Sequence, residues 1–437
     1  MVPFTVQGPS RVNGKVSPPG DKSIAHRFLI LGCLSRNSTV INNFPFNDDC
    51  LATARAFKCF GLEIVLSRSK GSLKVKGKGL RGLERPGRVI FTGESGTTLR
   101  LLLGVLAGQD FPVKLTCARA LAKRPMLRVT APLRKMGAKI ICRKDPQGEE
   151  YPPVIVRGGG LTGIIYKMPV ASAQVKSAIL LAGLYAMGRT QVVEPVKTRD
   201  HTERLLKSFG AAIKTSGGKI SVEGGKELRS PGVVYVPGDI SSAAFFMVLA
   251  VITGGSRVVL KDTGLNPSRL GIIRVLKRMG AGIKITTRRS PGAKYEPMGD
   301  IEVKSGNLKG VVVRKSEIPS LIDELPVLMV AACFARGNSR FEGAGELRVK
   351  ETDRIRSMSE NLRKMGADIR VTRSEDIIII PGNGLAGAKV KSFGDHRTAM
   401  SMVVAGMAAR GTTVIDDVNC ISKSFPDFLK VLRSITI

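Results

Sequence analysis

A short motif that recurs along the chain constrains the fold more than any other feature. The motif reads Leu-basic-x-apolar-Gly-Ala-x-Ile, and its copies end at Ile140, Ile213, Ile283 and Ile369, with a weaker copy ending at Ile64. A basic last helical turn, a glycine that can adopt the left-handed conformation and a β-branched residue are typical of a helix that turns into a strand. Each copy therefore predicts a helix-to-strand turn, and the copies recur roughly every 70 to 86 residues.

A second pattern alternates with the first. In it, an Ala- and Leu-rich helix runs through small or polar residues into a β-rich segment, and its six copies cover residues 33–42, 105–115, 185–194, 251–260, 333–342 and 408–417. The two patterns together predict six helix-strand-helix-strand units of about 70 residues, three in each half of the chain. The predicted fold class is α/β, with two pseudo-equivalent domains.

Two similar segments mark where the chain is expected to pass between these domains. Pro19-Gly20-Asp21 follows a strand-like stretch and precedes an apolar helix, and Pro237-Gly238-Asp239 does the same. Proline fixes φ and glycine permits a sharp bend, so both segments suit a chain crossing. We therefore expect one domain of residues 21–237, inserted into a second domain built from residues 1–20 and 238–437.

The charge balance limits the partners of the protein. The 437 residues include 69 Lys and Arg against 35 Asp and Glu, a formal net charge of +34. Such a surplus attracts nucleic acid, anionic lipid and phosphorylated metabolites alike. The chain has no Trp and five Tyr, so it lacks the aromatic platforms on which single-stranded nucleic acids stack. Most of the charge is expected to be a solvated surface.

Cysteine, histidine and apolar content indicate a cytoplasmic protein without a metal. Seven cysteines form no C-x-x-C pair and leave an odd count, which argues against a disulfide framework and a zinc ribbon. The three histidines form no cluster at metal-ligand spacing. The longest apolar run, residues 243–252, is too short to cross a bilayer, and residues 1–20 lack the apolar core of a signal peptide.

The first candidate anion site follows the first Pro-Gly-Asp segment. Lys22, Ser23 and Arg27 lie on the first turns of the expected helix, where free N–H groups and the helix dipole favour an anion. The spacing is not that of a Walker loop, because Asp21 stands where that loop needs glycine. An ordinary helix start with exposed basic residues is the alternative.

Other helix starts in the first half offer similar surroundings. A strand over residues 88–91 is expected to run through a glycine-rich turn into a helix from Thr97, and Gly96 would let a ligand approach the backbone closely. The other polar groups of this half that precede or open an expected helix are Lys123 and Arg124 before Pro125, then Ser172, Gln174 and Lys176, and then Thr198, Asp200 and His201. Basic turns and capped helices with solvated side chains are the alternative.

The second half holds the most reactive set of side chains. Asp323 and Glu324 stand at the head of an apolar helix. Lys350, Glu351 and Arg354 are expected together near the start of another helix, whose core stripe comprises Ile355, Met358, Leu362 and Met365. Glu351 between two cations could exchange protons while its neighbours hold an anion, and a surface charge network is the alternative.

Two more groups complete the set. Asp395, His396 and Arg397 precede a third apolar helix, and Lys423 precedes the last one. Every anion-suited group is thus expected at the N-terminal end of a helix.

Together and in this order, the motifs resemble those of the enolpyruvyl transferase family, and most specifically the 5-enolpyruvylshikimate-3-phosphate (EPSP) synthases. The segments that carry the resemblance are PGDKSIAHR (19–27), GESGTTLR (93–100), KRP (123–125), SAQVKSA (172–178), IDELP (322–326), RVKETDR (348–354), GDHR (394–397) and KSFPDF (423–428). RVKETDR and GDHR are the most specific, and the match covers essentially the whole chain.

The resemblance implies a fold and a reaction. Each domain would contain three βαβαββ repeats with their helices inward, an inside-out α/β barrel. The reaction would transfer the enolpyruvyl group of phosphoenolpyruvate to the 5-hydroxyl of shikimate 3-phosphate and release phosphate, with neither metal nor cofactor. The 21–237 domain would be the shikimate 3-phosphate side, and the other domain would carry the catalytic acid and base.

The resemblance also implies roles for individual residues. Asp323 would take the proton from the attacking hydroxyl, Glu351 would supply one to the methylene carbon, and Lys22 would complete the catalytic set. The residues implied to hold shikimate 3-phosphate are Lys22, Ser23, Arg27, Ser172, Ala173, Gln174, Thr198, Asp323 and Lys350. Those implied to hold phosphoenolpyruvate are Lys22, Gly96, Arg124, Gln174, Arg354, Arg397 and Lys423.

Four positions depart from the pattern common in the family. Ala173 stands where many members have a second serine and can offer only backbone groups, and Thr198 stands where serine is usual. Glu346 stands where some members have asparagine. Glu94 stands where many have asparagine, and its carboxylate would repel an anion unless it is paired or turned away. Glu94 is therefore left out of the predicted site.

Two alternative functions stay open at this point. UDP-N-acetylglucosamine enolpyruvyl transferases share the fold and chemistry but usually carry a reactive cysteine in a mobile loop, and the corresponding residues 122–128 (AKRPMLR) contain none. A basic nucleic-acid-binding scaffold would explain the net charge but not Glu351 among cations. We expect a monomer that acts on small molecules, with no membrane partner and no nucleic acid partner.

Overall fold

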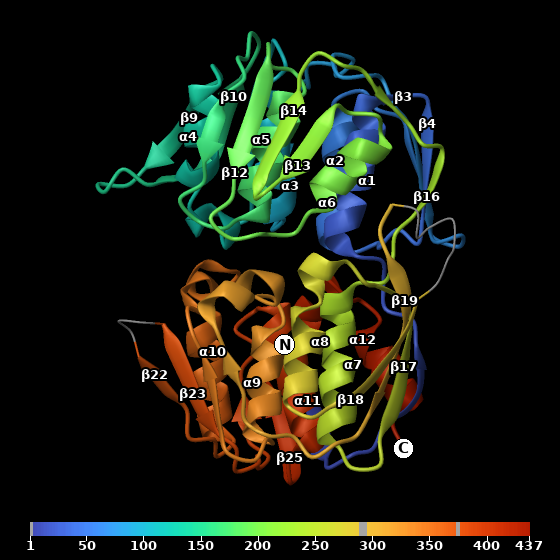
Figure 1. The fold of residues 1–437 in the computed structure, drawn as a ribbon, viewed down its shortest axis with the longest axis vertical. Coiled ribbons are helices and arrows are strands. Elements are labelled where there is room, and N and C mark those ends of the chain that lie inside the picture. Colours follow the sequence, from blue (N-terminus) through green and yellow to red (C-terminus); the bar gives the residue numbers. More distant parts are fainter. Residues whose placement is uncertain (1–2, 288–294, 373–375) are drawn as a thin grey trace. The chain divides into compact units, whose positions relative to one another are not determined.

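The computed structural model describes residues 3–287, 295–372 and 376–437, which form two compact units (Figure 1). The middle unit contains residues 20–236 together with Tyr295 and Glu296. The terminal unit contains the described residues before position 20 and after position 236, apart from those two.

In the middle unit, β3 (Ser35–Arg36) and β15 (Leu228–Arg229) pair in a two-stranded sheet, and the other strands form three similar sheets. Their bounds are β4 (Ser38–Asn42), β5 (Ile64–Ser67), β6 (Ser72–Lys76), β7 (Ile90–Phe91), β8 (Pro112–Thr116), β9 (Lys139–Lys144), β10 (Glu150–Arg157), β11 (Ile165–Lys167), β12 (Arg189–Val193), β13 (Ile213–Ser216), β14 (Lys219–Glu223) and β16 (Val233–Tyr235). The sheet orders are β16-β4-β6-β5, β7-β8-β10-β9 and β11-β12-β14-β13. In each sheet the first pair is parallel and the other two pairs are antiparallel.

The terminal unit repeats this plan. Its strands are β1 (Phe4–Gly8), β2 (Asn13–Val16), β17 (Arg257–Gly264), β18 (Gly282–Thr287), β19 (Met298–Lys304), β20 (Val312–Val313), β21 (Asn338–Phe341), β22 (Arg370–Thr372), β23 (Ile377–Pro381), β24 (Lys389–Val390) and β25 (Gly411–Ile415). Two sheets have the orders β18-β19-β17-β2 and β20-β21-β23-β22, and a third has the order β1-β25-β24. The antiparallel pairing of β1 with β25 joins the two ends of the chain in one sheet.

Two kinds of helix alternate along the described chain. The first kind comprises α1 (Lys22–Leu34), α3 (Gly96–Leu106), α5 (Ala173–Gly183), α7 (Ile240–Ile252), α9 (Leu325–Cys333) and α11 (His396–Ala408). These helices are buried on nearly every side, as expected for helices at the centre of a core. In the terminal unit, α7, α9 and α11 lie against one another with strands outside them (Figure 1).

The second kind of helix buries one face only. It comprises α2 (Asp48–Cys59), α4 (Leu127–Lys135), α6 (His201–Ser208), α8 (Gly271–Arg278), α10 (Arg354–Lys364) and α12 (Phe428–Ile435). In α10 the predicted core stripe is confirmed, since Ile355, Met358 and Leu362 are buried, as is Met365 just after the helix. The α/β class and the βαβαββ repeats with inward helices are also confirmed.

The glycine of the repeated motif explains the helix-to-strand turns. In all five copies it has a positive φ, namely 79° at Gly61, 112° at Gly137, 80° at Gly210, 100° at Gly280 and 92° at Gly366. This backbone conformation is strained for residues with a Cβ atom. The predicted turns are therefore confirmed, and glycine is required for them.

Three local predictions are wrong. The strand expected over 88–91 contains only Ile90 and Phe91, which pair with two residues of β8. Pro125 does not open a helix, because the N–H of Met126 is bonded to the carbonyl of Glu150 and α4 begins at Leu127. Lys423 precedes α12 as predicted, but it ends a 3-10 helix, Asn419–Lys423, and does not lie at a helix N-terminus. Arg124 likewise follows a 3-10 helix, Leu121–Lys123, so not every anion-suited group lies at a helix N-terminus.

Candidate active site

The first candidate group lies at the start of α1 in the middle unit. Asp21 caps this helix, because its carboxylate accepts a hydrogen bond of 3.0 Å from the Ile24 N–H, so Ser23 is not the cap. Lys22 and Ser23 are the first two helical residues. The Nζ atom of Lys22 lies 2.8 Å from Oδ2 of Asp49 in the first turn of α2. This ion pair ties the start of α1 to the next helix.

Arg27 joins three helices of the middle unit. Its guanidinium donates to Oγ1 of Thr202 at 2.6 Å, to Oγ of Ser177 at 2.7 Å and to the carbonyl of Ser23 at 2.8 Å. Burial lowers the pKa of Arg27 to about 10, although the carboxylate of Glu203 opposes this shift. Arg27 therefore remains a cation at neutral pH, held mainly by uncharged groups.

Gly96 and Arg124 come together at the start of α3. A Cβ atom on Gly96 would lie 2.9 Å from Nη1 of Arg100 and 3.1 Å from Nη1 of Arg124. The missing side chain thus leaves room for two guanidinium groups beside the helix N-terminus. The motifs did not assign a role to Arg100, although its place one helical turn after Gly96 was a usable signal.

Gln174 connects the starts of α3 and α5. Its Oε1 accepts a hydrogen bond of 2.8 Å from Arg100, and its Nε2 donates to Oγ1 of Thr97 at 3.0 Å. Ser172 caps α5 by accepting from the N–H of Val175 at 3.4 Å. Ala173 is the first residue of α5. Gln174 is therefore fixed by its neighbours rather than solvated.

Thr198 and Lys176 meet at a buried carboxylate. The hydroxyl of Thr198 donates to Oε1 of Glu194, and its N–H donates to the same atom at 3.1 Å. Lys176 is fully buried, with Nζ 3.0 Å from Glu194 and 2.6 Å from Glu203. The alternative of a solvated side chain therefore does not hold for Lys176. Because the Thr198 hydroxyl donates to a carboxylate, its oxygen is left as an acceptor for a ligand.

Asp200 and His201 belong to the same part of the middle unit. His201 opens α6, and its Nδ1 lies 2.7 Å from Oε1 of Glu296, with both side chains buried. Asp200 forms a surface ion pair of 2.9 Å with Arg204. Neither residue contacts the predicted ligand groups through these bonds.

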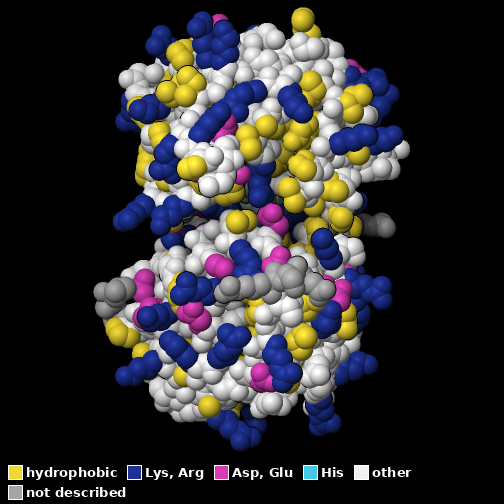
Figure 2. Space-filling view, turned by 90° about the vertical axis from the view of Figure 1, so that its left-hand side faces the viewer, with side chains coloured by type: hydrophobic (Ala, Val, Ile, Leu, Met, Phe, Trp, Pro, Cys, Tyr) yellow, Lys and Arg dark blue, Asp and Glu magenta, His cyan; other side chains and the backbone are white. Residues whose placement is uncertain are grey.

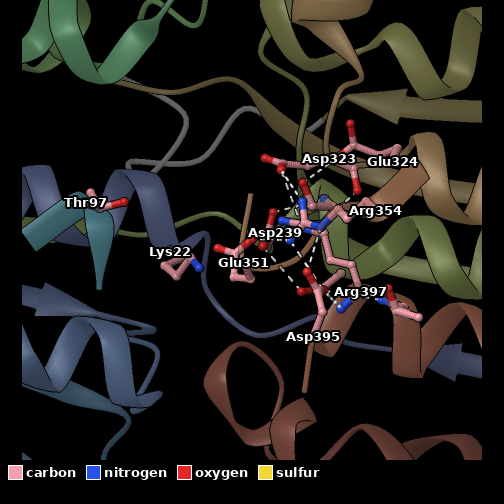
Figure 3. A network of polar contacts seen from close by, with 12 residues as sticks. Lys22, Thr97, Asp239, Asp323, Glu324, Glu351, Arg354, Asp395 and Arg397 are labelled. Atoms are coloured by element: carbon pink, nitrogen blue, oxygen red, sulfur yellow. Dashed lines mark hydrogen bonds and ion pairs between the residues drawn. The ribbon is translucent and has the colours of Figure 1, made fainter. Parts of the chain in front are cut away.

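In the terminal unit, Arg354 is the centre of the candidate site (Figure 3). It opens α10 and is only 1% exposed. Its guanidinium lies 2.9 Å from Oδ2 of Asp395, 2.5 Å from Oε2 of Glu351 and 3.4 Å from Oδ1 of Asp323. Three carboxylates from three segments therefore converge on one buried cation, and the alternative of a surface network does not hold for Arg354.

Electrostatics keep Arg354 and Asp395 ionised. Burial by itself would lower the pKa of Arg354, but the carboxylates of Asp395, Glu351 and Asp323 outweigh it and raise that pKa above its ordinary value. Burial would raise the pKa of Asp395, but Arg354 outweighs burial and lowers it. Each partner thus stabilises the charged form of the other.

Arg397 adds a second cation to the cluster. Its Nη1 donates to the backbone carbonyl of Asp323 at 3.1 Å, and its Nε lies 3.5 Å from Oδ1 of the same residue. Asp395 caps α11 and accepts from the Arg397 N–H at 2.7 Å. Lys423 donates to the carbonyl of Gly394 at 3.1 Å. These bonds bring Asp323, Glu351, Arg354 and Arg397 together.

Lys350 lies beside the Arg354 cluster in the sequence, and further Lys and Arg side chains are spread over the surface. Lys350 follows the 3-10 helix Gly345–Val349 and directly precedes Glu351. Figure 2 shows the Lys and Arg side chains dispersed over the visible face of each unit, as expected for a mainly solvated charge. Within the described ranges, no set of three His, Cys, Asp or Glu side chains is placed to hold a metal ion. In the same ranges, every helix is too short or too polar to span a membrane.

Comparisons with known proteins agree with this geometry. A family model described as EPSP synthase (3-phosphoshikimate 1-carboxyvinyltransferase) matches residues 6–432. The 3-phosphoshikimate 1-carboxyvinyltransferase of Desulforamulus reducens is 47% identical over 98% of this chain and 98% of its own length. That of Geotalea uraniireducens is 46% identical over 100% of both chains.

Solved structures give the same result. The structure of EPSP synthase from Acinetobacter baumannii has a TM-score of 0.86 at 43% identity, over 99% of this chain and 98% of that chain. The enolpyruvyl transferase NikO from Streptomyces tendae has a TM-score of 0.77 at 16% identity, over 99% and 97% of the two chains. The second likeness concerns the fold alone.

Proposed function

Because the chain belongs to the EPSP synthase (3-phosphoshikimate 1-carboxyvinyltransferase) family, we propose how its own residues divide the work of that reaction. The enzyme transfers the enolpyruvyl group of phosphoenolpyruvate to the 5-hydroxyl of shikimate 3-phosphate and releases phosphate. Family membership decides against the UDP-N-acetylglucosamine enzyme and against a non-catalytic nucleic-acid scaffold.

We propose that the middle unit supplies most of the groups that hold shikimate 3-phosphate. Lys22 and Arg27 would attract its phosphate, and Ser23 lies between them on the first turn of α1. Ser172, Ala173 and Gln174 would present the N-terminus of α5, which favours an anion. Thr198 would accept a hydrogen bond from a substrate hydroxyl, since its own proton is held by Glu194. Asp323 and Lys350 of the terminal unit complete the proposed set.

We propose that phosphoenolpyruvate is held by cations and Gln174 beside Gly96. Arg124 would contact it beside the open backbone of Gly96. Lys22 and Gln174 are the other proposed ligands from the same unit. From the terminal unit, the proposed ligands are Arg354, Arg397 and Lys423. The close packing of Arg100 and Arg124 around the position of the absent Cβ supports this role for Gly96.

We propose Asp323 as the base and Glu351 as the acid, with Lys22 in the catalytic set. Asp323 would remove the hydroxyl proton as the oxygen bonds to C2 of phosphoenolpyruvate, and Glu351 would protonate C3, giving a tetrahedral adduct. Loss of a C3 proton and of phosphate would then restore the double bond. The convergence of both carboxylates on Arg354 carries this proposal, because it holds an acid and a base side by side.

An assay of phosphate release tests the proposal. We expect release from phosphoenolpyruvate only when shikimate 3-phosphate is present, with no added metal. Release that does not depend on shikimate 3-phosphate would contradict it. That the enzyme is a cytoplasmic monomer, and that residues 21–237 form the shikimate 3-phosphate side, remain predictions.

A further inference from the structure

Glu324, which follows Asp323 directly, lies in a buried chain of hydrogen bonds. It is 1% exposed, and its Oε1 accepts a hydrogen bond from the hydroxyl of Ser241 on α7. Glu324 occupies the N-cap position of α9, so its side chain links the turn that carries Asp323 to a neighbouring helix. Figure 3 shows Asp323 and Glu324 side by side at this turn.

The direction of this chain is fixed by its other end. Nη2 of Arg269, which is 2% exposed, donates to Oγ of Ser241 at 2.7 Å and lies 3.2 Å from Oδ1 of Asp239. A guanidinium has no acceptor, so Ser241 must accept from Arg269 and direct its own proton to Glu324. The chain of hydrogen bonds therefore runs from Arg269 through Ser241 to Glu324, whose carboxylate accepts the last bond.

The same turn is held from its other side. Arg397 donates to the backbone carbonyl of Asp323 at 3.1 Å. This carbonyl belongs to the planar peptide that joins Asp323 to Glu324. Glu324 is anchored through Ser241 on one side, and the peptide is anchored through Arg397 on the other. The two anchors restrict the backbone from which the Asp323 carboxylate projects.

The repeated Pro-Gly-Asp segment shows why the Glu324 carboxylate is stabilised at the start of α7. Ser241 stands two residues after Asp239, just as Ser23 stands two residues after Asp21. Both aspartates cap their helices. At the α1 start the proposed ligand is a substrate anion, whereas at the α7 start the anion is the chain's own Glu324. A helix N-terminus stabilises either kind of negative charge.

We propose that Arg269, Ser241 and Glu324 are positioning residues that orient Asp323 for proton abstraction. This inference rests on the proposed role of Asp323 as the base. A misplacement of about 1 Å can cost about 100-fold in rate. The network would therefore act mainly on kcat through Asp323 and would leave the binding of phosphoenolpyruvate, to which Asp323 is not assigned, nearly unchanged.

The test is a cycle of Glu324→Ala and Asp323→Asn, with kcat and KM measured by phosphate release. In the otherwise unchanged enzyme we expect Glu324→Ala to lower kcat about 10- to 100-fold, with KM for phosphoenolpyruvate within about threefold. In the Asp323→Asn background the same change should cost less than about threefold, because its target is already absent. Glu324→Gln keeps an acceptor for Ser241 and should retain kcat within about threefold of the unchanged enzyme.

Ser242→Ala is the matched control for Ser241→Ala. Both serines are buried on the first turn of α7, but the Ser242 hydroxyl donates to Asp239 at 3.3 Å and not to Glu324. We expect Ser241→Ala to lower kcat at least fivefold more than Ser242→Ala. This pair also tests the inference if Glu324→Ala does not fold.

The outcomes separate this inference from the proposed function. If Glu324→Ala and Ser241→Ala keep normal kcat while Asp323→Asn is inactive, the positioning inference is wrong and the base assignment stands. An equal loss from Glu324→Ala in both backgrounds would also overturn the inference, since it would show an effect that bypasses Asp323. Near-normal turnover by Asp323→Asn would instead remove the base assignment.

Discussion

Arg27 and Arg354 are both buried, and each belongs to the first turns of a helix, yet their surroundings are opposite. Arg27 in the middle unit donates to two hydroxyls and a carbonyl, and burial lowers its pKa to about 10. Arg354 in the terminal unit lies against three carboxylates, which outweigh burial and raise its pKa.

Under the proposed function, this difference lets one repeated fold serve two chemical tasks. A cation held by neutral groups keeps its charge available for a substrate phosphate. A cation surrounded by carboxylates instead holds them close together, and it keeps Asp395 ionised. The units share their βαβαββ repeats, so the contrast arises from the side chains at the helix starts.

The largest expected effect is the loss of kcat when a carboxylate of the terminal unit, Asp323 or Glu351, is replaced. Asp323→Asn and Glu351→Gln should each lower kcat by about 10²- to 10⁴-fold, because each removes a group that transfers a proton. Steady-state phosphate release measures this, and circular dichroism checks the fold. Turnover within a few-fold of normal in either variant would exclude that residue from proton transfer.

Replacement of Arg354 or Arg27 by methionine should lower the free energy of unfolding by different amounts, because the two arginines have different partners. Arg354→Met leaves the buried Asp395 without its cation and should lower the free energy of unfolding by about 3–5 kcal/mol. Arg27→Met leaves hydroxyls and a carbonyl unsatisfied and should cost about 1–3 kcal/mol. Urea unfolding of both variants measures the difference, and equal losses would refute the contrast.

Gly96→Ala should moderately raise KM for one substrate, phosphoenolpyruvate. The added Cβ would displace the ends of Arg100 and Arg124. Moving side chains off their preferred rotamers costs about 0.5–1.5 kcal/mol, or roughly two- to tenfold in affinity. We expect KM for phosphoenolpyruvate to rise by that factor while KM for shikimate 3-phosphate stays constant. A rise in the second KM alone would place Gly96 beside the other substrate.

The smallest expected effect is on the pH dependence of stability. The pKa of Asp395 is lowered by Arg354 despite its burial, so this residue stabilises the fold at neutral pH and its contribution is lost as the pH falls below about 4. Burial raises the pKa of Glu203, although Lys176 opposes the shift, so Glu203 should have the opposite effect and become less costly on acidification.

Urea unfolding between pH 3 and pH 6 measures these slopes. Compared with the unchanged protein, Asp395→Asn should lose less stability on acidification, and Glu203→Gln should lose more. Slopes that change in the same direction in both variants would contradict the assigned pKa shifts.

Local patterns predicted the repeats and much of the candidate site. The glycine at each helix end was predictable because its conformation depends on the adjacent residues, as the positive φ of Gly137 and Gly366 illustrates. The grouping of Glu351 with Arg354 was predictable because the two residues are only three positions apart, although Glu351 precedes α10. Both depend on neighbours in the sequence.

Contacts between distant segments were not predictable in this way. Arg269 has no motif, and its role depends on Ser241, 28 residues earlier. The burial of Lys176 depends on Glu194 and Glu203, which approach it only when the third repeat packs. The helix expected after Lys123 and Arg124 begins at Leu127 and not at Pro125, because the N–H of Met126 is bonded to the carbonyl of Glu150 at the start of β10.

Glu351, in the Arg354 cluster, is proposed to deliver the proton to C3 of phosphoenolpyruvate. Mass spectrometry of the product made in D₂O tests this step most directly, because a solvent-derived deuteron at C3 of the adduct is retained in part when the double bond re-forms. We predict that the unchanged enzyme incorporates deuterium, and that Glu351→Gln slows incorporation about 10²- to 10⁴-fold while calorimetry shows normal binding of shikimate 3-phosphate. Incorporation at the normal rate by Glu351→Gln would contradict the account.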